Sequence, residues 1–461
     1  MRTRTFLVAA ALLSSGLTPL ALAAPATAAA SKYADDFNGD GYRDLAVGDE
    51  TATTGGKKQA GAVAVVWGTA RGLDPAKRTV ITENSPNVAG GAETNDFFGS
   101  KITPVDLNKD GYGDLLVAAP GEDVGGKGAF TVLWGAKSGL TSGSQYRSPG
   151  FAKDLAVGDF NADGKLDVVA VDDEYVWFIR GPFTKSGTRG TATNLDPIHG
   201  EDINPDMVVS GKVTKDGTAD FAVVGYDTDT RTNRLWFYRG STSGPVKPPR
   251  KIGLPGSPDL AGSSATIADF NKDGYGDVAI GVSRSGAGGA VKILPGTSAG
   301  PATSVRTITQ NTASVPGTSE NGDMFGYDVS AWDSNGDDYP DLAVGAPREA
   351  LGDNFWSTGA VTVLRGSASG LTGKNSRQYD YATTGVEGPM DEGDTWFGAS
   401  VLLRDYNRDG RAELIATSPE IGRLHLLPGT RSGPTGTGST TLKVADLGLG
   451  ARPYFGAALA D

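Results

Sequence analysis

The sequence contains no cysteine and only two histidines, and no apolar run of membrane-spanning length follows residue 24. The lack of cysteine excludes disulfides, thiol catalysis and thiolate metal sites. Acidic residues (54) outnumber Lys and Arg (42), giving a formal charge of −12. An acidic chain is a poor partner for nucleic acid or anionic membranes and a good partner for cations. These absences predict a chain whose stabilising element is something other than a disulfide.

The first 30 residues have the pattern of an export signal. Arg2 and Arg4 precede an apolar run from Phe6 to Ala24, and small residues continue to Ala30. A membrane anchor is the alternative, but Ser14, Ser15, Gly16 and Pro19 interrupt the run, which is short for a span. We therefore expect residues 1–30 to be a signal peptide, cleaved between residues 24 and 31, and residues 31–461 to form a secreted, extracellular domain without membrane insertion.

An acidic nine-residue motif recurs along the rest of the chain. It reads DFNGDGYRD from Asp36, DLNKDGYGD from Asp106, DFNADGKLD from Asp159, DFNKDGYGD from Asp269, DSNGDDYPD from Asp333 and DYNRDGRAE from Asp405. A degenerate copy, KVTKDGTAD, begins at Lys212. Internal repeats of this kind indicate a repeat architecture and have to be considered before any other pattern.

Each motif is followed by strand-like segments. An apolar run such as LAVGD or LLVAAP comes first, and an alternating segment ending in a glycine turn comes next. Phe-Gly precedes three of the motifs, at Phe98-Gly99, Phe325-Gly326 and Phe397-Gly398. Alternation predicts half-buried strands. Seven units of four strands predict an all-β, seven-bladed β-propeller.

The two ends of the chain supply an independent prediction. The segment after residue 30 leaves no room for a Phe-Gly strand before Asp36, whereas an unpaired one, Tyr454-Phe455-Gly456 and onward, ends the chain. We expect this C-terminal strand to join the N-terminal blade and close the ring, which would remove an open sheet edge.

The Phe-Gly pairs, the acidic loops and Gly345-Ala346-Pro347 together resemble the FG-GAP repeat. That repeat forms the seven-bladed head of integrin α chains and occurs in many bacterial exported proteins. The resemblance covers nearly all of residues 31–461 and is best in blades one, two, six and seven. The resemblance implies that the acidic loops lie on one face of the propeller and that the loops on the opposite face contact a partner. It carries no integrin-like role here, because the partner chain is absent.

The loops have the composition of calcium sites. Side-chain oxygens at positions 1, 3, 5 and 9 and a carbonyl near position 7 supply the oxygen ligands that a hard cation needs, and magnesium prefers fewer protein ligands. Ordinary Asx turns are the alternative, and six copies in register favour calcium. The predicted ligands are Asp36, Asn38, Asp40, Tyr42 and Asp44; Asp106, Asn108, Asp110, Tyr112 and Asp114; Asp159, Asn161, Asp163, Lys165 and Asp167; Asp269, Asn271, Asp273, Tyr275 and Asp277; Asp333, Asn335, Asp337, Tyr339 and Asp341; Asp405, Asn407, Asp409, Arg411 and Glu413.

We expect about six structural Ca²⁺ ions and none in the degenerate loop. Lys212 and Thr214 replace its first two ligands, while Asp216 and Asp220 remain. The Lys212 ammonium could take the place of the ion, or Lys212 could simply be solvated, since surface ion pairs contribute little.

Catalytic signals are weak. Ser298 lies in GTSAG, which matches a nucleophile elbow in letters but occupies the glycine turn of a strand repeat rather than a strand-to-helix turn. His199 lies in a predicted loop near Asp196 and Glu201, and His425 lies within a predicted strand. We predict no catalytic residue, although hydrolases and lyases that use carboxylates alone remain open.

Ligand-binding candidates lie in the loops expected opposite the acidic motifs. Aromatic side chains beside carboxylates suit sugar stacking or a protein contact, and such loops carry function on rigid scaffolds. The alternative is that Trp356 and Trp396 fill gaps between blades. Trp67, Trp134, Trp177 and Trp236 are expected in the core. The candidates are Glu93, Glu320, Phe355, Trp356, Glu392 and Trp396.

The predicted function is non-catalytic binding of an extracellular glycan or protein by a monomer. The alternative is a carbohydrate- or lipid-active enzyme that uses carboxylates on the face opposite the calcium loops.

Overall fold

The computed structural model describes residues 31–122, 127–195, 203–256, 264–351, 357–389, 393–449 and 458–460. The predicted signal segment lies outside these residues. Within them, no helix has the length and apolar character needed to traverse a bilayer. The only helical elements described are two short 3₁₀ turns, η1 (Pro419–Ile421) and η2 (Val444–Leu447).

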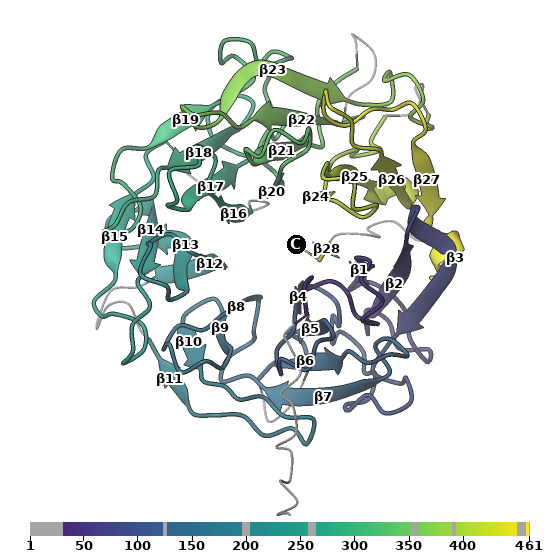
Figure 1. Ribbon diagram of the computed structural model, residues 1–461, viewed down its shortest axis with the longest axis vertical. Coiled ribbons are helices and arrows are strands. Elements are labelled where there is room, and N and C mark those ends of the chain that lie inside the picture. Colours follow the sequence, from purple (N-terminus) through teal and green to yellow (C-terminus); the bar gives the residue numbers. More distant parts are fainter. Residues whose placement is uncertain are drawn as a thin grey trace, which may run out of the picture.

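The strands form seven four-stranded antiparallel sheets arranged as blades around an axis (Figure 1). The prediction of a seven-bladed propeller is therefore confirmed. Blade one contains β28 (Ala458–Leu459), β1 (Leu45–Asp49), β2 (Ala62–Thr69) and β3 (Gly72–Ile81); blade two β4 (Ile102–Val105), β5 (Asp114–Ala119), β6 (Ala129–Trp134) and β7 (Ser142–Arg147); blade three β8 (Asp154–Gly158), β9 (Asp167–Val171), β10 (Val176–Ile179) and β11 (Ala192–Asn194); blade four β12 (Ile203–Gly211), β13 (Asp220–Asp227), β14 (Thr232–Tyr238) and β15 (Arg250–Gly253). Blade five contains β16 (Ala265–Ala268), β17 (Asp277–Val282), β18 (Ala290–Leu294) and β19 (Arg306–Ile308); blade six β20 (Val329–Trp332), β21 (Asp341–Ala346), β22 (Ala360–Arg365) and β23 (Thr372–Tyr379); blade seven β24 (Val401–Arg404), β25 (Glu413–Ser418), β26 (Arg423–Leu427) and β27 (Thr440–Lys443).

The ring is closed by the two ends of the chain. Strand β28 pairs antiparallel with β1, with Val47 opposite Leu459 and Gly48 opposite Ala458. In Figure 1 β28 lies at the axial side of β1, in the position that β4 takes in blade two. The predicted closure is confirmed, while Tyr454, Phe455 and Gly456 lie outside the described residues.

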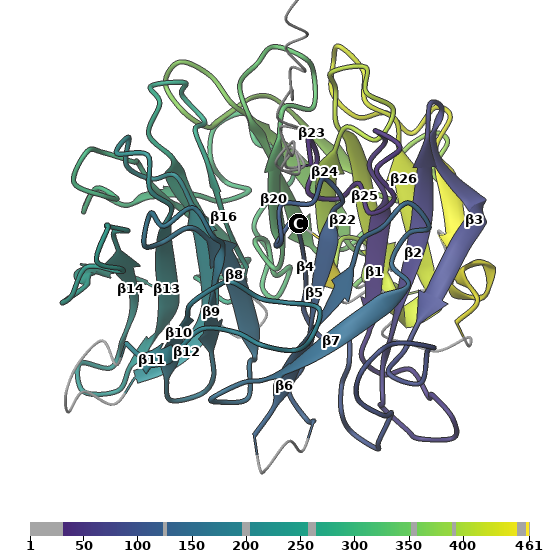
Figure 2. The ribbon, with the colours of Figure 1, turned by 60° about the horizontal axis from the view of Figure 1, so that its bottom comes forward.

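The apolar core lies between neighbouring blades. In one of the seven clusters, Ala46 and Val63 of blade one pack against Leu115 and Val117 of blade two. Every residue of β5, β6, β21 and β22 is buried. The expectation of half-buried third strands is thus wrong, because each blade is covered on both faces by its neighbours (Figure 2). Burial of one Val or Leu side chain stabilises a fold by roughly 1.5–3 kcal/mol.

Each of the three Phe-Gly pairs, in blades two, six and seven, joins its blade to the one before it. Gly61, at the start of β2, forms a parallel bridge with Phe98 of the next blade, and Gly289 and Gly359 form the same bridge with Phe325 and Phe397. Gly61 has φ +85°, and a Cβ there would lie 2.0 Å from the Phe98 carbonyl oxygen. Only glycine allows this close approach of two backbones.

The topology separates two faces. In blades two to seven the acidic motif, degenerate in blade four, connects the first strand to the second, and in blade one it directly precedes the second strand, β1. All of the motifs therefore lie on one face, here called the loop face. The segments before the first strands, after the second strands and after the fourth strands lie at the opposite ends, on the Phe-Gly face. The loops expected to contact a partner therefore gather on the Phe-Gly face.

Candidate metal and ligand sites

The six acidic loops share one hydrogen-bonded geometry. In the first, the Asp40 N–H donates to Asp36 Oδ1 (3.1 Å) and Asn38 Oδ1 (2.8 Å), the Gly41 N–H donates to Asp36 Oδ2 (2.8 Å), and the Tyr42 N–H donates to Asp40 Oδ1 (2.9 Å). The same set recurs in the loops from Asp106, Asp159, Asp269, Asp333 and Asp405. Side-chain oxygens of positions 1, 3 and 5 are thus turned toward the inside of one tight loop.

Position 9 is a buried anchor. Asp44 accepts the Phe37 N–H at Oδ2 (2.9 Å) and the Gly68 N–H, from the end of the third strand, at Oδ1 (2.8 Å). The Asp114, Asp167, Asp277 and Asp341 carboxylates are held in the same way. In blade seven the longer Glu413 accepts from the Tyr406 N–H and from Asn407 Nδ2. The sequence prediction missed this second role, which fixes the loop to the sheet.

Burial makes these anchors costly to ionise. Burial, together with a smaller effect of the neighbouring loop carboxylates, raises the pKa of Asp44 to about 8 and the pKa values of Asp114 and Glu413 to about 7. Burial is also the first cause of the raised pKa values of Asp167 and Asp277, about 6 each. A divalent cation among positions 1, 3, 5 and 7 would favour the ionised forms, so this donor set fits calcium.

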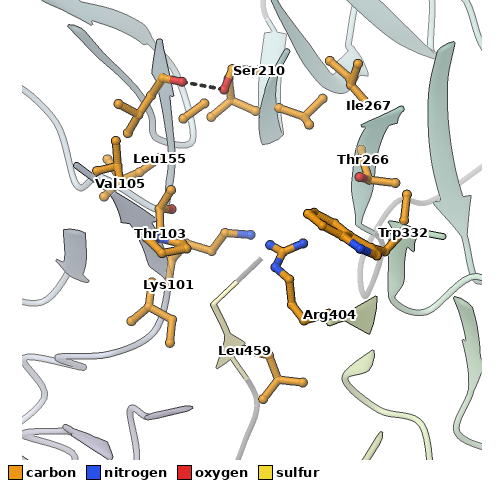
Figure 3. Close-up of a pocket in the computed structure, with 18 residues that line it drawn as sticks. Lys101, Thr103, Val105, Leu155, Ser210, Thr266, Ile267, Trp332, Arg404 and Leu459 are labelled. Carbon is orange, nitrogen blue, oxygen red and sulfur yellow. Dashed lines mark hydrogen bonds between the residues drawn. The ribbon is translucent and has the colours of Figure 1, made fainter. Parts of the chain in front are cut away.

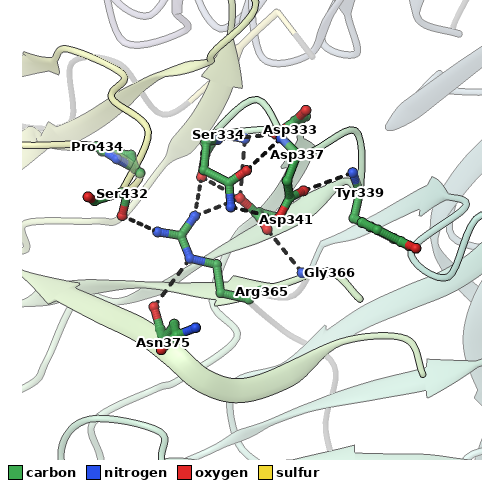
Figure 4. A network of polar contacts seen from close by, with 12 residues as sticks. Asp333, Ser334, Asp337, Tyr339, Asp341, Arg365, Gly366, Asn375, Ser432 and Pro434 are labelled. Atoms are coloured by element: carbon green, nitrogen blue, oxygen red, sulfur yellow. Dashed lines mark hydrogen bonds and ion pairs between the residues drawn. The ribbon is translucent and has the colours of Figure 1, made fainter. Parts of the chain in front are cut away.

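In blade six a buried arginine reaches the position-9 anchor of the loop (Figure 4). Arg365 is 6% exposed, and its Nη1 donates to Asp341 Oδ2 and to Ser334 Oγ, each at 2.7 Å. Asp338 stands where the other motifs have glycine and adopts φ +67°. Burial still raises the pKa of Asp341, although Arg365 lowers it. The anchor of this loop already has a cationic partner.

The degenerate loop of blade four has its own cation. Arg239 Nε lies 2.7 Å from Asp216 Oδ2 and helps to lower the pKa of Asp216, although burial opposes this. Thr214 donates both its N–H and its hydroxyl to Asp220. Lys212 is exposed. The cation paired with Asp216 in this loop is therefore Arg239, the residue before the glycine turn, whereas Lys212 is solvated.

Only some of the predicted ligand-binding residues can be placed. Glu93 and Glu320 are exposed on the Phe-Gly face. Trp396 is half-buried and meets the Tyr327 ring edge to face, with centroids 6.2 Å apart. Phe355, Trp356 and Glu392 lie outside the described residues. Trp134 and Trp236 are in the core as expected, whereas Trp67 and Trp177 are only partly buried.

A cavity of about 360 Å³ lies on the axis of the ring (Figure 3). The first strands of the blades line it, and Lys101, Trp332 and Arg404 contribute its charged and aromatic side chains. Lys101 lies 3.4 Å from Asp154, and the Arg404 guanidinium lies 5.0 Å from the Trp332 ring centroid. No sequence signal indicated this cavity, because its wall takes a few residues from each blade.

The weak catalytic signals correspond to structural roles. Ser298 is exposed in the turn where Thr297 Oγ1 donates to the Gly300 carbonyl. His425 is fully buried in β26, between Tyr381 and Thr441. His199 lies outside the described residues.

Comparison with known proteins gives the family of the repeats. The FG-GAP repeat model matches residues 33–66, 98–133 and 325–364, and the FG-GAP-like repeat model matches residues 212–280. The phosphatidylinositol-glycan-specific phospholipase D of Rattus norvegicus is 32% identical over 164 residues, which are 33% of this chain and 18% of the relative. The Homo sapiens protein of the same name is 32% identical over 146 residues, 29% of this chain and 17% of the relative. The chain therefore spans only a small part of the length of these relatives.

A solved structure agrees with the architecture. A 6-phosphogluconolactonase-like structure from Bacteroides fragilis superposes with a TM-score of 0.50 at 12% identity, covering 90% of this chain and 97% of that one. At this identity the likeness shows the fold alone. With the repeat matches and the closed ring of seven blades, it follows that the chain is a β-propeller that contains FG-GAP repeats at several positions and is homologous to other FG-GAP-containing proteins.

Proposed function

We propose that the protein is an exported, calcium-stabilised propeller that acts as a non-catalytic binding module for an extracellular glycan or protein. The axial cavity carries the binding part of this proposal. Its size falls in the range of small-ligand sites, and Lys101 and Trp332 offer a cation and an aromatic ring for a sugar that bears an acidic group. The rigid ring also presents the exposed loops of the Phe-Gly face to a larger partner.

Calcium binding is tested by a matched pair of variants. D110N removes a position-5 carboxylate from an intact loop, whereas D216N removes the same position from the degenerate loop. Native mass spectrometry of protein saturated with calcium should show one ion fewer in D110N and an unchanged count in D216N. A chelator should lower the Tm of the wild-type protein sharply. An unchanged melt would contradict a stabilising role for calcium, and an ion that depends on Asp216 would contradict the empty fourth loop.

Ligand binding is tested on the cavity itself. A glycan array probed in calcium should identify acidic glycans, and K101Q should weaken their binding. Lys101 is partly exposed, so its loss should leave the fold intact. K374Q, at an exposed lysine on outer strand β23, is the matched control. Equal loss of binding in both variants would mean that the cavity is not the site, and a protein partner captured without any glycan signal would shift the proposal to the Phe-Gly face.

A second candidate is a carbohydrate- or lipid-active enzyme. It is supported by the similarity to proteins named phosphatidylinositol-glycan-specific phospholipase D, which covers about a third of this chain. Purified protein should then release the lipid from a glycosylphosphatidylinositol substrate, or reducing ends or unsaturated uronate from a glycan. Absence of turnover by a protein that binds the same compound would favour the binding module.

Export is tested by the mature N-terminus. Protein secreted by the cells that make it should begin between residues 24 and 31. Retention of the full segment in the cell fraction would contradict the proposed signal peptide.

A further inference from the structure

Two groups of three carboxylates lie on the Phe-Gly face, away from the acidic loops. Oxygens of Glu83, Asp96 and Glu122 lie within 4.8 Å of one another, and so do those of Glu320, Asp323 and Glu349. We call them the first and the second carboxylate cluster. Each cluster takes residues from two segments. One segment connects two successive blades, and the other follows the second strand of the later blade. The first cluster lies between blades one and two, and the second between blades five and six.

The two clusters are built on the same repeat positions. Glu93 donates its N–H to Asp96 Oδ2, and Glu320 donates its N–H to Asp323 Oδ2. The corresponding residues are separated by one constant interval in the sequence, so the arrangement is produced twice by the fold. The pairs are Glu83 and Gln310, Glu93 and Glu320, Asp96 and Asp323, Glu122 and Glu349, and Gly90 and Gly317.

Buried polar atoms in both clusters have no partner within the described part of the chain. Glu83 is 2% exposed, and neither of its carboxylate oxygens has a hydrogen bond. Beside the second cluster lies Gln310, which is also 2% exposed and donates from Nε2 to Glu349 Oε2 at 2.6 Å. This hydrogen bond holds the Gln310 amide against the carboxylates. Its Oε1 nevertheless has no donor. Buried oxygens that lack a donor are costly unless a cation or another donor reaches them.

A glycine leaves space beside each cluster. A Cβ on Gly90 would lie 3.0 Å from Glu83 Oε1 and 2.9 Å from Gln145 Nε2, and a Cβ on Gly317 would lie 3.0 Å from Gln310 Nε2. Both glycines have positive φ, +106° and +90°, and both are exposed. The clusters are therefore buried against the blades and open toward solvent at the glycine.

We propose that the two carboxylate clusters bind divalent cations, with calcium as the ion that their all-oxygen ligands favour. The ligands of the first site are Glu83, Asp96 and Glu122, and those of the second are Gln310, Asp323 and Glu349, with Glu320 at the rim. Each ion would tie two blades together on the face opposite the acidic loops. The proposal does not depend on calcium binding by those loops.

Burial of carboxylates close to one another supports the proposal. Burial, together with a smaller effect of the charges of Glu122 and Asp96, raises the pKa of Glu83 to about 9. The pKa values of Asp323 and Glu349 are raised to about 6 and about 7, again mainly by burial. A bound cation would offset this repulsion.

Calcium counting by native mass spectrometry tests the two sites, using residues 31–461 with calcium as the only added metal. E122Q and E349Q should each bind one ion fewer than the wild-type protein, and the double variant two fewer. E387Q is the matched control, because Glu387 is exposed in the corresponding connection of blade seven, where Tyr381 replaces Glu83 and Gln310. Unchanged counts in E122Q and E349Q would overturn the proposal. The count lost in D110N reports separately on the acidic loops.

Glu83 of the first cluster corresponds to Gln310 beside the second, and swapping these two residue types gives a second test. One of the two variants adds a ligand instead of removing one. Q310E gives the second cluster the carboxylate that the first one has, and E83Q gives the first cluster the amide. Calorimetric titration of metal-free protein should show tighter calcium binding in Q310E and weaker binding in E83Q, by tenfold or more. If the calcium affinity is unchanged in both variants, the carboxyl groups only share protons with one another, and the proposed metal sites are refuted.

Discussion

The buried imidazole of His425 should make the propeller sensitive to mild acid. The side chain is fully buried between blades six and seven, with Nε2 3.1 Å from Tyr381 Oη and Nδ1 3.1 Å from Thr441 Oγ1. The Phe397 ring lies 5.2 Å away, centroid to centroid. Burial, assisted by the Arg423 charge, lowers the pKa of His425 to about 3.

The sign follows from proton binding. In the unfolded chain the pKa is about 6.5, so below that pH the unfolded state takes up a proton that the folded state refuses. The stability contributed by the neutral imidazole is complete above pH 6.5 and is lost as the pH falls toward 3. Each pH unit in this window costs about 1.36 kcal/mol, which gives about 2 kcal/mol at pH 5.

The assay compares the wild-type protein with H425T in urea at pH 7, 6 and 5, with calcium present throughout. Threonine stands at the corresponding position of the third strand in blades two and six, as Thr131 and Thr362. Loss of the ring contacts lowers the free energy of unfolding of H425T at every pH, so only the difference in pH dependence matters. Between pH 7 and 5 the wild-type protein should lose about 2 kcal/mol more than H425T. Parallel pH profiles would refute the reasoning.

Three further predictions concern the scaffold. G61A should be less stable than G56A in urea, because both residues have positive φ but only a Cβ on Gly61 meets backbone, and equal stabilities would contradict the close approach of the blades. R365Q leaves Asp341 buried without its cation and should cost about 3–5 kcal/mol in chelator, whereas R377Q, at an exposed arginine on β23, should cost little. Deletion of residues 458–461 should speed amide hydrogen exchange in β1 more than in β5, and uniform exchange would mean that the pairing with β28 contributes nothing.

Features that repeat along the chain were predictable from the sequence. The number of blades and the closure by the last strand followed from the phase of the repeats, and the structure confirms both. The burial of the second and third strands was not predictable from alternation, because Val63 faces one neighbouring blade and Ala64 faces the other. Both residues are apolar for that reason, and few positions in these strands alternate to a polar side chain.

Sites that draw on several blades were not visible in the sequence. Lys101 and Arg404 reach the axial cavity from blades two and seven, and nothing in the local sequence of either indicates the other. In the first carboxylate cluster, Glu122 lies in a different segment from Glu83 and Asp96, although the constant interval between the first and second clusters was a signal that an internal comparison could have found. The position-9 residues were predicted as calcium ligands, which stays a prediction, and their contact with the third strand could be seen only once the sheet was known.

The pairing of β28 with β1 has a consequence for how the molecule is made. Three strands of blade one are synthesised first and the fourth last, so the first blade stays incomplete until the ribosome has added Leu459. The final blade-to-blade contact must therefore form late, by a search between distant ends of the chain. A circularly permuted chain with its break between two blades should therefore fold without this late pairing of the chain ends.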